Sequence, residues 1–344
     1  MITLAGEPAA RPIRWGILST ARIARQRIAP ALLKSPSTAL AAVASRSLES
    51  AQAFAGAFDI PKAYGSYQEL FDDPEIDVIY NALPNHLHAE TVRAALARGK
   101  HVLCEKPMGA NRAELLGLRE AAGDRLVAEA FMFRHHPQWQ EIRRILASGR
   151  IGAARTVQSY FSFLNVDPAN IRNRVETGGG HLLDIGCYVV AAARLIFDAE
   201  PLRVLALIDR DPAMGTDRTA SFLADFGDGR QLSATISTQI FRHQRIGIVG
   251  TTGRIEVPTP FSAPTDESAQ IFIDTHGPGH PPEPITLPPV DQYALQAEAF
   301  SRAVAGTGPW TFGLDDALAN MAVLDALFRS ETSGSWEAPV GGDA

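Results

Sequence analysis

The first residues that could do chemistry follow an apolar stretch. Glu105 and Lys106 come directly after "HVLC", which is typical of a buried strand, and Pro107 fixes the direction of the chain behind them. In open parallel α/β sheets, ligands bind at the carboxyl ends of the strands. The position therefore predicts that the Lys106 ammonium points into a ligand crevice; the alternative is a Lys–Glu pair that solvates a loop.

A second group lies in "ETGGGHLLDIGCYVVAAARLIF", where three glycines precede a helix that is apolar on almost all sides. His181, Asp184 and Tyr188 fall on one stripe of this helix, and Asp184 and Tyr188 are direct neighbours four residues apart. Because burying an unpaired carboxylate costs several kcal/mol, the stripe must face water, a partner or a ligand. The glycines let another backbone or a ligand approach the helix start, which favours a binding site over a solvent-facing stripe.

A third candidate is the turn "GILSTARIA", between a predicted strand and a predicted helix. Dinucleotide-binding turns of this kind carry three glycines, and their places fall here on Ser19, Ala21 and Ala24. All three replacements are small, Ser19 and Thr20 add hydroxyl donors, and the helix N-terminus supplies unpaired amides. Alone, the stretch fits a nucleotide turn and a plain strand–helix turn equally well.

The end of the next strand, "AVASRSLES", lacks the acidic residue that binds the ribose hydroxyls of NAD. Arg46, with Ser45 and Ser47 on either side, suits a 2′-phosphate through charge-assisted, forked hydrogen bonds, although a surface arginine at a helix start is the alternative. Read together with the turn, this predicts NADP(H), with NAD(H) as the second choice. The residues predicted to line the cofactor are Ser19, Thr20, Ala21, Arg22, Ile23, Ser45, Arg46, Leu83, Pro84, Asn85, His86, Glu105, Lys106 and Arg134.

The histidines are not expected to bind metal. His86 and His88 lie two residues apart, so they face different sides of the helix expected at 86–98, and both are interpreted as polar helix-start residues. The doublet His135 and His136 is interpreted as structural, because adjacent residues on one rigid element do not converge easily. No metal site is predicted.

The elements around these residues alternate in a regular way from Ile13 to about Phe131. Short apolar runs separated by amphipathic stretches are typical of a parallel sheet with crossover helices. After a helix at about 138–148, runs such as "ARTVQSYFSF", "TASFLADF" and "RQLSATISTQI" show β-type alternation with hairpin punctuation. We therefore expect an antiparallel sheet interrupted by one helix, with the Pro-rich "HGPGHPPEPITLPPV" as a loop or edge.

The predicted fold class is an α/β Rossmann domain with a mostly parallel, doubly wound sheet, followed by an α+β domain with an open, mainly antiparallel sheet. Two closing helices, at 292–305 and 314–329, are expected to pack back on the body. The predicted parts are an N-terminal tail at 1–12, the dinucleotide-binding domain at 13–131, a substrate and oligomerisation domain at 132–331 that includes the closing helices, and a C-terminal tail at 332–344.

Composition limits the partners. The 344 residues carry a net charge of −6 without long basic or acidic blocks, which argues against nucleic acid and anionic lipid and favours small molecules. Residues 1–12 lack the pattern of a signal peptide, and no apolar run has the length of a membrane span, so a soluble cytoplasmic protein is expected. Cys104 and Cys187 are far apart in sequence and are expected to be reduced and buried.

With "EKP" and "GGGHLLDIGCY" at this separation, the chain resembles the Gfo/Idh/MocA family of glucose-fructose oxidoreductase, inositol dehydrogenase and rhizopine-catabolism proteins, from Arg14 to about Arg329. The stretches "GSYQELFDDPEIDVIYNALPN", "EAFMFRHHPQ", "DPANIRNRVETGGG" and "GTTGRIEVP" look most like its branch of D-xylose dehydrogenases and dimeric dihydrodiol dehydrogenases. The resemblance implies a homodimer or homotetramer, assembled through the antiparallel sheet.

The resemblance also implies roles for the residues singled out above. Lys106 would contact nicotinamide and substrate, and Asp184 would bind substrate hydroxyls. Many members have a histidine four residues after that aspartate, where this chain has Tyr188, which favours a tyrosine acid/base. Lowering a tyrosine pKa from about 10 to about 8 takes roughly 2.7 kcal/mol. A lysine ammonium at about 4 Å supplies roughly 4 kcal/mol at an effective dielectric of ~20.

The prediction is thus an NADP(H)-dependent oxidoreductase that moves hydride between nicotinamide and a sugar, polyol or cyclic diol. The alternative is a non-catalytic, dinucleotide- and sugar-sensing regulator of the same family. Arg172 and Arg134 are candidates for the crevice lining or for structural ion pairs, and His181 has no assigned role. The predicted catalytic residues are Lys106, Tyr188 and Asp184, and the predicted substrate contacts are Lys106, Arg172, Asp184 and Tyr188.

Overall fold

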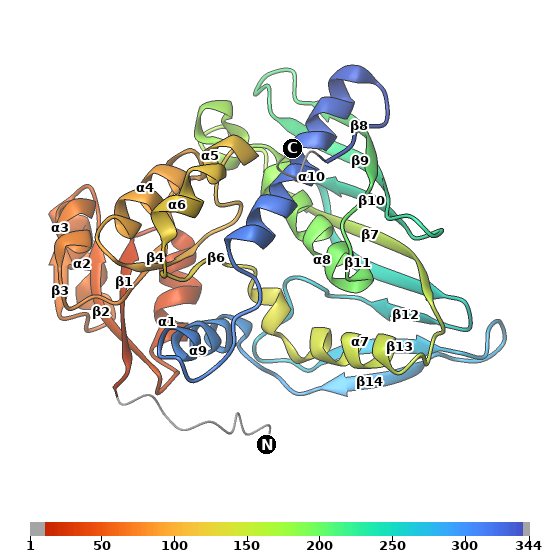
Figure 1. Cartoon of the computed structure of the whole chain (residues 1–344), viewed down its shortest axis with the longest axis horizontal. Helices are drawn as coiled ribbons and strands as arrows, with labels where there is room; N and C mark the ends of the chain where they lie inside the picture. The colour runs from red at the N-terminus through yellow and green to blue at the C-terminus, as the bar shows by residue number, and fades with distance from the viewer. Residues whose placement is uncertain (1–10, 340–344) are drawn as a thin grey trace. The chain divides into compact units, whose positions relative to one another are not determined.

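A computed structural model describes residues 11–339, so the expected N-terminal tail falls almost wholly outside the described residues, as do positions 340–344 of the C-terminal one. The chain forms two compact units, and each unit contains segments that are far apart in the sequence (Figure 1). The first unit takes in the chain up to Gly109, Ala113–Met132 and Asp291–Ala317; the second takes in Ala110–Arg112, Phe133–Val290 and the chain from Leu318.

The sheet of the first unit is entirely parallel, where a mostly parallel sheet was predicted. Its strand order is β3-β2-β1-β4-β5-β6, so the order reverses between β1 and β4, and ligands of such sheets bind at the carboxyl ends beside that point. The residues at these ends are the ones singled out in the sequence. The strands are β1 (Ile13–Leu18), β2 (Thr38–Ala44), β3 (Lys62–Tyr64), β4 (Val78–Asn81), β5 (His101–Cys104) and β6 (Val127–Glu129).

Two helices of this unit end or begin at residues that suit helix caps. Ser47 Oγ accepts a hydrogen bond from the amide of Ser50 and so caps α2, while Gly99, with φ of +71°, follows α4. The short β3 and α3 were not predicted. The helical elements up to residue 122 are η1 (Ala24–Ile28), α1 (Ala29–Leu32), α2 (Leu48–Ala57), α3 (Tyr67–Asp72), η2 (Asn85–Leu87), α4 (His88–Leu96), α5 (Arg112–Leu116) and α6 (Leu118–Ala122).

Helix α9 (Gln292–Val304) belongs to the first unit, although both closing helices were predicted to belong to the second domain. The physical reason is the core of the parallel sheet. The buried Trp15 of β1 donates from Nε1 to Ser301 Oγ at 2.9 Å, and its ring lies 5.6 Å from that of Phe300. Helix α10 (Leu314–Ser333) has its first four residues in the first unit and the rest in the second.

The second unit contains an eight-stranded sheet in the order β14-β13-β12-β11-β7-β10-β9-β8. Neighbouring strands are antiparallel except β7 and β10, which are parallel. The stretch expected as one strand, "RQLSATISTQI", is divided at Thr238 between β10 and β11. The strands are β7 (Ala154–Leu164), β8 (Arg203–Arg210), β9 (Asp217–Asp225), β10 (Gln231–Ser237), β11 (Gln239–Gly250), β12 (Arg254–Val257), β13 (Ala269–Asp274) and β14 (Glu283–Leu287).

One helical stretch, Val175–Phe197, is long and apolar enough to cross a membrane, but its most apolar part is 94% buried inside the protein. It is therefore a core helix of the second unit. Glu337, in the expected C-terminal tail, pairs with Val204 of β8 through backbone hydrogen bonds. The other helical elements of this unit are η3 (Met132–His135), whose first residue belongs to the first unit, α7 (Pro137–Ala147), η4 (Ile171–Asn173), η5 (Val175–Thr177), η6 (Leu182–Gly186) and α8 (Cys187–Phe197).

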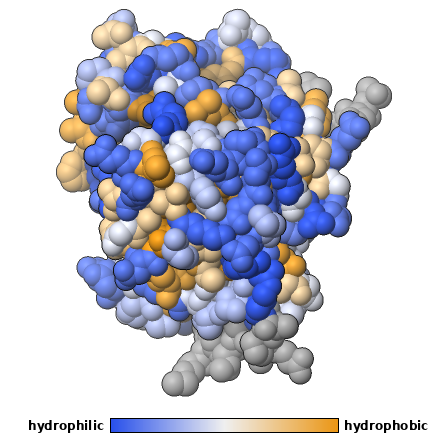
Figure 2. All heavy atoms as spheres, turned by 90° about the vertical axis from the view of Figure 1, so that its left-hand side faces the viewer, coloured by the Kyte–Doolittle hydropathy of each residue, from blue (hydrophilic) through white to orange (hydrophobic). Residues whose placement is uncertain are grey.

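The face of the molecule shown in Figure 2 is mainly hydrophilic, with apolar residues scattered in small groups. This agrees with the mean hydropathy of −0.03 and with a net charge spread along the chain. Both cysteines are buried and reduced, as expected.

Candidate active site

The turn after β1 has a glycine-like backbone without a glycine. Ser19 has φ of +89°, its amide donates to the carbonyl of Ala44 at 2.9 Å, and its Oγ accepts from the amide of Ala21 at 3.2 Å. Ala24 is fully buried at the start of η1, a π-helical turn. The tight-turn role of the first glycine is thus filled by Ser19, and the close-packing role of the third by Ala24.

Replacing Ser19 with glycine should raise the free energy of unfolding of the cofactor-free protein by about 1 kcal/mol. A positive φ strains a residue with a Cβ and does not strain glycine. The matched control is Ser45→Gly, a neighbouring loop serine outside the positive-φ region, which should lower the unfolding free energy by about 0.5–1 kcal/mol. Urea unfolding measures both; a Ser19→Gly protein less stable than wild type would contradict the strain.

The end of β2 presents Arg46 to solvent. Burial raises the pKa of Tyr67, and the positive charge of Arg46 nearby opposes that rise, so the two side chains are close in space. An exposed guanidinium at the end of the second strand could bind a 2′-phosphate, and the residues that follow β2 are Ser45, Arg46 and Ser47 rather than an acidic residue.

The corner after β5 is tied to β4. Tyr80, a buried residue of β4, donates its hydroxyl to the Glu105 carboxylate, and the amide of Met108 donates to Glu129 Oε1 at 2.8 Å. The Lys106–Pro107 peptide bond is cis. Lys106 therefore lies in a stretch whose neighbours on both sides are held by hydrogen bonds.

His88 is not the polar helix-start residue that the sequence suggested. It is fully buried, with Nδ1 2.6 Å from the carbonyl of Pro107 and Nε2 2.7 Å from the carbonyl of Leu83. Burial lowers the pKa of His88 to about 4. The ring bridges the two predicted cofactor corners, "ALPN" and "EKP". Its spacing from the buried Val92, one helical turn later, is the signal that could have revealed this burial.

The three glycines before η6 make room for protein rather than for a ligand. A Cβ on Gly179 would lie 2.6 Å from the carbonyl oxygens of Arg172 and Arg174, and the amide of Gly180 donates to the carbonyl of Arg172 at 2.9 Å. Arg172 Nε also donates to Asp184 Oδ2 at 2.8 Å. The glycine run thus seats the loop that brings a guanidinium to the buried carboxylate, which is the partner that Asp184 required.

Asp184 lies within a π-helical turn, and Tyr188 lies in the first turn of α8 that follows it. A π turn holds more residues than an α turn, so the single stripe expected from regular helical spacing does not apply across it. The surroundings of the three side chains differ accordingly. His181 contacts Thr238, Asp184 contacts Arg172, and Tyr188 lies among aromatic rings.

Three phenylalanines surround Tyr188, which is 7% exposed. Its ring lies 5.7 Å from that of Phe133, 6.0 Å from Phe161 and 5.6 Å from Phe261. The three come from η3, β7 and the loop after β12, so no sequence pattern could have grouped them. The cluster fixes the plane of the tyrosine ring and makes its surroundings largely apolar.

The predicted cofactor residues fall into two groups. All except Arg134 belong to the first unit, at the ends of β1, β2, β4 and β5. Arg134 is a buried residue of η3 in the second unit. His86 is exposed. Of the adjacent pair His135 and His136, His136 has a structural role, because its Nδ1 accepts a hydrogen bond from the amide of Gln138 and caps α7.

Comparison with known proteins gives matches to two family models. Residues 13–129 match an oxidoreductase family with an NAD-binding Rossmann fold, and residues 139–256 match the GFO/IDH/MocA C-terminal domain. Among curated relatives, D-xylose 1-dehydrogenase (NADP(+)) 2 of Haloferax volcanii is 36% identical over 93% of this chain and 98% of its own. Trans-1,2-dihydrobenzene-1,2-diol dehydrogenase of Xenopus laevis is 37% identical over 73% of this chain and 77% of its own.

Among solved structures, a 3-ketoreductase from Actinomadura kijaniata in complex with NADP and TDP-benzene superimposes with a TM-score of 0.86. It is 32% identical, and the match covers 93% of this chain and 98% of that one. The predicted family, the predicted branch and the two-domain fold class are thereby confirmed.

Proposed function

Since the chain belongs to the Gfo/Idh/MocA oxidoreductase family, we propose that this NAD(P)-dependent oxidoreductase interconverts an alcohol and a carbonyl on a sugar, polyol or cyclic diol, with NADP(H) preferred. The observation that carries the proposal is a single buried helix that presents an ion-paired carboxylate, Asp184, and a tyrosine, Tyr188, in successive turns. When bound, the nicotinamide accepts or donates the hydride.

Tyr188 is assigned the role of acid/base. Oxidation requires a base at the substrate hydroxyl, and reduction requires an acid at the same oxygen. A phenol serves both directions, and its aromatic surroundings limit the access of water that would compete for the proton. Lys106 is assigned the role of stabilising negative charge on the reacting oxygen, because an ammonium is effective where charge develops in a site that excludes water.

Asp184 and Arg172 are assigned to the other substrate oxygens. Asp184 forms an ion pair with Arg172 at 2.8 Å, and a carboxylate accepts strong hydrogen bonds from hydroxyl groups. The Arg172 side chain is 37% exposed and the Asp184 side chain 11%, so the guanidinium is the more accessible partner. Together they supply both an acceptor and a donor for a substrate with neighbouring oxygens.

Arg46→Ala should weaken NADPH binding by a factor of about 10–100 and change the Kd of NADH less than threefold. A hydrogen bond to a charged group contributes about 1.5–3 kcal/mol, and only NADPH carries the 2′-phosphate. Fluorescence titration with both cofactors measures this, with NADH as the internal control. Equal losses for the two cofactors, or a wild-type preference for NADH, would remove the assigned role of Arg46.

The test of the proposed activity is a panel of aldoses, ketosugars and cyclic diols, assayed with NADP+ and NADPH by absorbance of the reduced cofactor. Turnover of at least one of them is expected. Tight NADPH binding with no absorbance change on any substrate would instead favour the sensor role.

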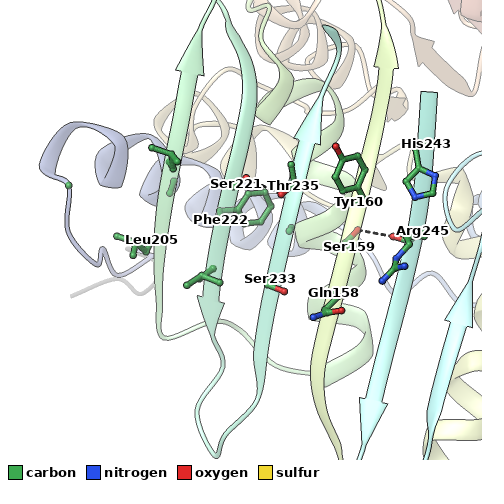
Figure 3. Close-up of a pocket in the computed structure, with 15 residues that line it drawn as sticks. Gln158, Ser159, Tyr160, Leu205, Ser221, Phe222, Ser233, Thr235, His243 and Arg245 are labelled. Carbon is green, nitrogen blue, oxygen red and sulfur yellow. Dashed lines mark hydrogen bonds between the residues drawn. The ribbon is translucent and has the colours of Figure 1, made fainter. Parts of the chain in front are cut away.

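We also propose that the enzyme is a homo-oligomer that assembles through the open face of its eight-stranded sheet. The Phe161 ring of β7 faces α8, so Tyr160 and Gln158 face the opposite side. That side carries a groove of about 840 Å³, drawn in Figure 3, in which Tyr160 and His243 lie side by side on neighbouring strands. Exposed leucines on β8 and β9 continue this face, and a second copy offers the same surface about a two-fold axis.

In the double variant Leu207→Glu/Leu223→Glu, the oligomer should dissociate to the 37.0 kDa monomer. Both leucines lie on the open face, exposed by 77% and 44%, and unpaired carboxylates buried there would be costly. Light scattering coupled to size-exclusion chromatography measures the mass, and Leu33→Glu, an exposed leucine of the first unit, is the control. A wild-type protein that is monomeric would contradict the proposal.

A further inference from the structure

The helix that carries Asp184 and Tyr188 is capped by a carboxylate from another part of the chain. Asp217 is the first residue of β9, and its Oδ2 accepts from the amides of His181 and Leu182, both at 2.7 Å. These amides stand at the start of η6, where the residue at the cap position, His181, provides no side-chain cap of its own. The cap therefore comes from a strand 36 residues away in the sequence.

The approach of this carboxylate is close. Asp217 is 2% exposed, and a Cβ on Gly180 would lie 2.1 Å from its Oδ1. Gly180 has φ of +122°, a conformation that residues with a Cβ rarely adopt. Burial raises the pKa of Asp217, and the bond from the Leu182 amide opposes that rise. A buried carboxylate here has a cost that an ordinary serine or aspartate cap at position 181 would have avoided.

His181 fixes the same helix start to a second strand. The amide of Thr238, directly after β10, donates to His181 Nδ1 at 3.4 Å, so Nε2 carries the proton and donates to Thr238 Oγ1. Both residues are fully buried. The first residues of the helix are thus held from β9 on one side and from the β10–β11 junction on the other, and only two residues separate this anchor from Asp184.

We propose that Asp217 is a positioning residue for the reaction: it sets the height and rotation of the η6–α8 helix and so places Asp184 and Tyr188 against the substrate. This inference rests on the function proposed above. Displacements of about 1 Å at such groups lower rates by about 10²-fold, because the reacting atoms need near-contact geometry. Fixing the helix to the sheet that it covers prevents such displacements.

Two substitutions at Asp217 separate geometry from charge. Asp217→Asn keeps an oxygen acceptor in place and should leave kcat within threefold of wild type. Asp217→Glu keeps the charge but is longer by one methylene, so it should displace the helix, lower kcat at least tenfold and raise the substrate KM. In both variants NADPH affinity should stay within twofold, because the predicted NADP contacts other than Arg134 belong to the first unit. Asp225→Glu, at the other end of β9, is the matched control and should leave kcat unchanged.

If Asp217→Asn lowers kcat and Asp217→Glu does not, the charge of the residue matters rather than its geometry, and the proposal is overturned. Wild-type kcat and KM in Asp217→Glu would also overturn it. If Asp217→Glu does not fold, Gly180→Ala replaces it in the experiment. Its Cβ would lie 2.1 Å from Asp217 Oδ1 and would push the carboxylate and the helix start apart, so the same split between kcat and NADPH affinity is expected. Tyr188→Phe, measured in parallel, separates the two levels. A fully active Tyr188→Phe enzyme refutes the acid/base role proposed for Tyr188, whereas an inactive one beside a normal Asp217→Glu enzyme refutes only the positioning role.

Discussion

Replacing Tyr188 with phenylalanine should lower kcat by a factor of about 10²–10⁴, the usual contribution of a general acid/base. The substitution removes only the hydroxyl. The ring keeps its contacts with Phe133, Phe161 and Phe261, so the fold and the pocket shape should be unchanged. Steady-state kinetics on the substrate identified by the panel measures kcat, and fluorescence titration should give an NADPH Kd within twofold of wild type.

Tyr64→Phe is the control for this experiment. Tyr64 lies in β3 and donates its hydroxyl to Asp73 at 2.8 Å, so its loss changes stability and leaves the reacting groups untouched. We expect its kcat to stay within twofold of wild type. Wild-type turnover in Tyr188→Phe would show that another group moves the proton.

Lys106→Met should lower kcat by a factor of about 10²–10³, because a charged donor aimed at a developing oxyanion contributes roughly 3–4 kcal/mol. Methionine keeps the length of the side chain and removes the ammonium. The NADPH Kd should rise less than tenfold, because the phosphate contacts proposed at the ends of β1 and β2 do not involve Lys106. Lys34→Met, which removes a surface ion pair with Asp291, is the control.

The double variant Lys106→Met/Tyr188→Phe tests whether the two residues serve one reaction. Residues that act as a unit are strongly non-additive, so the double variant should lose little more activity than the worse single variant. Losses that multiply would indicate independent roles and contradict the assignment of both groups to one oxygen. A Lys106→Met enzyme with more than half of wild-type kcat would remove Lys106 from the chemistry.

The parallel sheet could be predicted because its signals are local. Apolar runs mark β1, β2, β4, β5 and β6, and Ser47 and Gly99 stand at the helix ends where capping chemistry requires them. Two short elements were not predicted, although Ser66 and Glu69 form a capping box at the start of α3. The strand β3 has three residues and α3 has six, too few for a periodic pattern to stand out.

The residues proposed to carry chemistry were chosen from the sequence, but their surroundings could not be predicted from it. Lys106 directly follows an apolar strand, and Asp184 and Tyr188 lie four residues apart in an apolar helix; both patterns are visible in the sequence. The Phe261 ring beside Tyr188, the Asp217 cap and the parallel β7–β10 pair depend on contacts between residues tens of positions apart. The placement of α9 in the first unit has the same cause, since only the packing of Trp15 on Phe300 reveals it.

The π turn at Leu182–Gly186 has a consequence for how this protein can be compared with others. It adds one residue to the helix. Every residue after it is therefore rotated by about 100° about the helix axis relative to its place in a continuous α-helix. A relative with one residue fewer at this point would aim a different side chain from the place of Tyr188. Counting four residues on from the aspartate identifies the equivalent acid/base only in chains that share this extra residue.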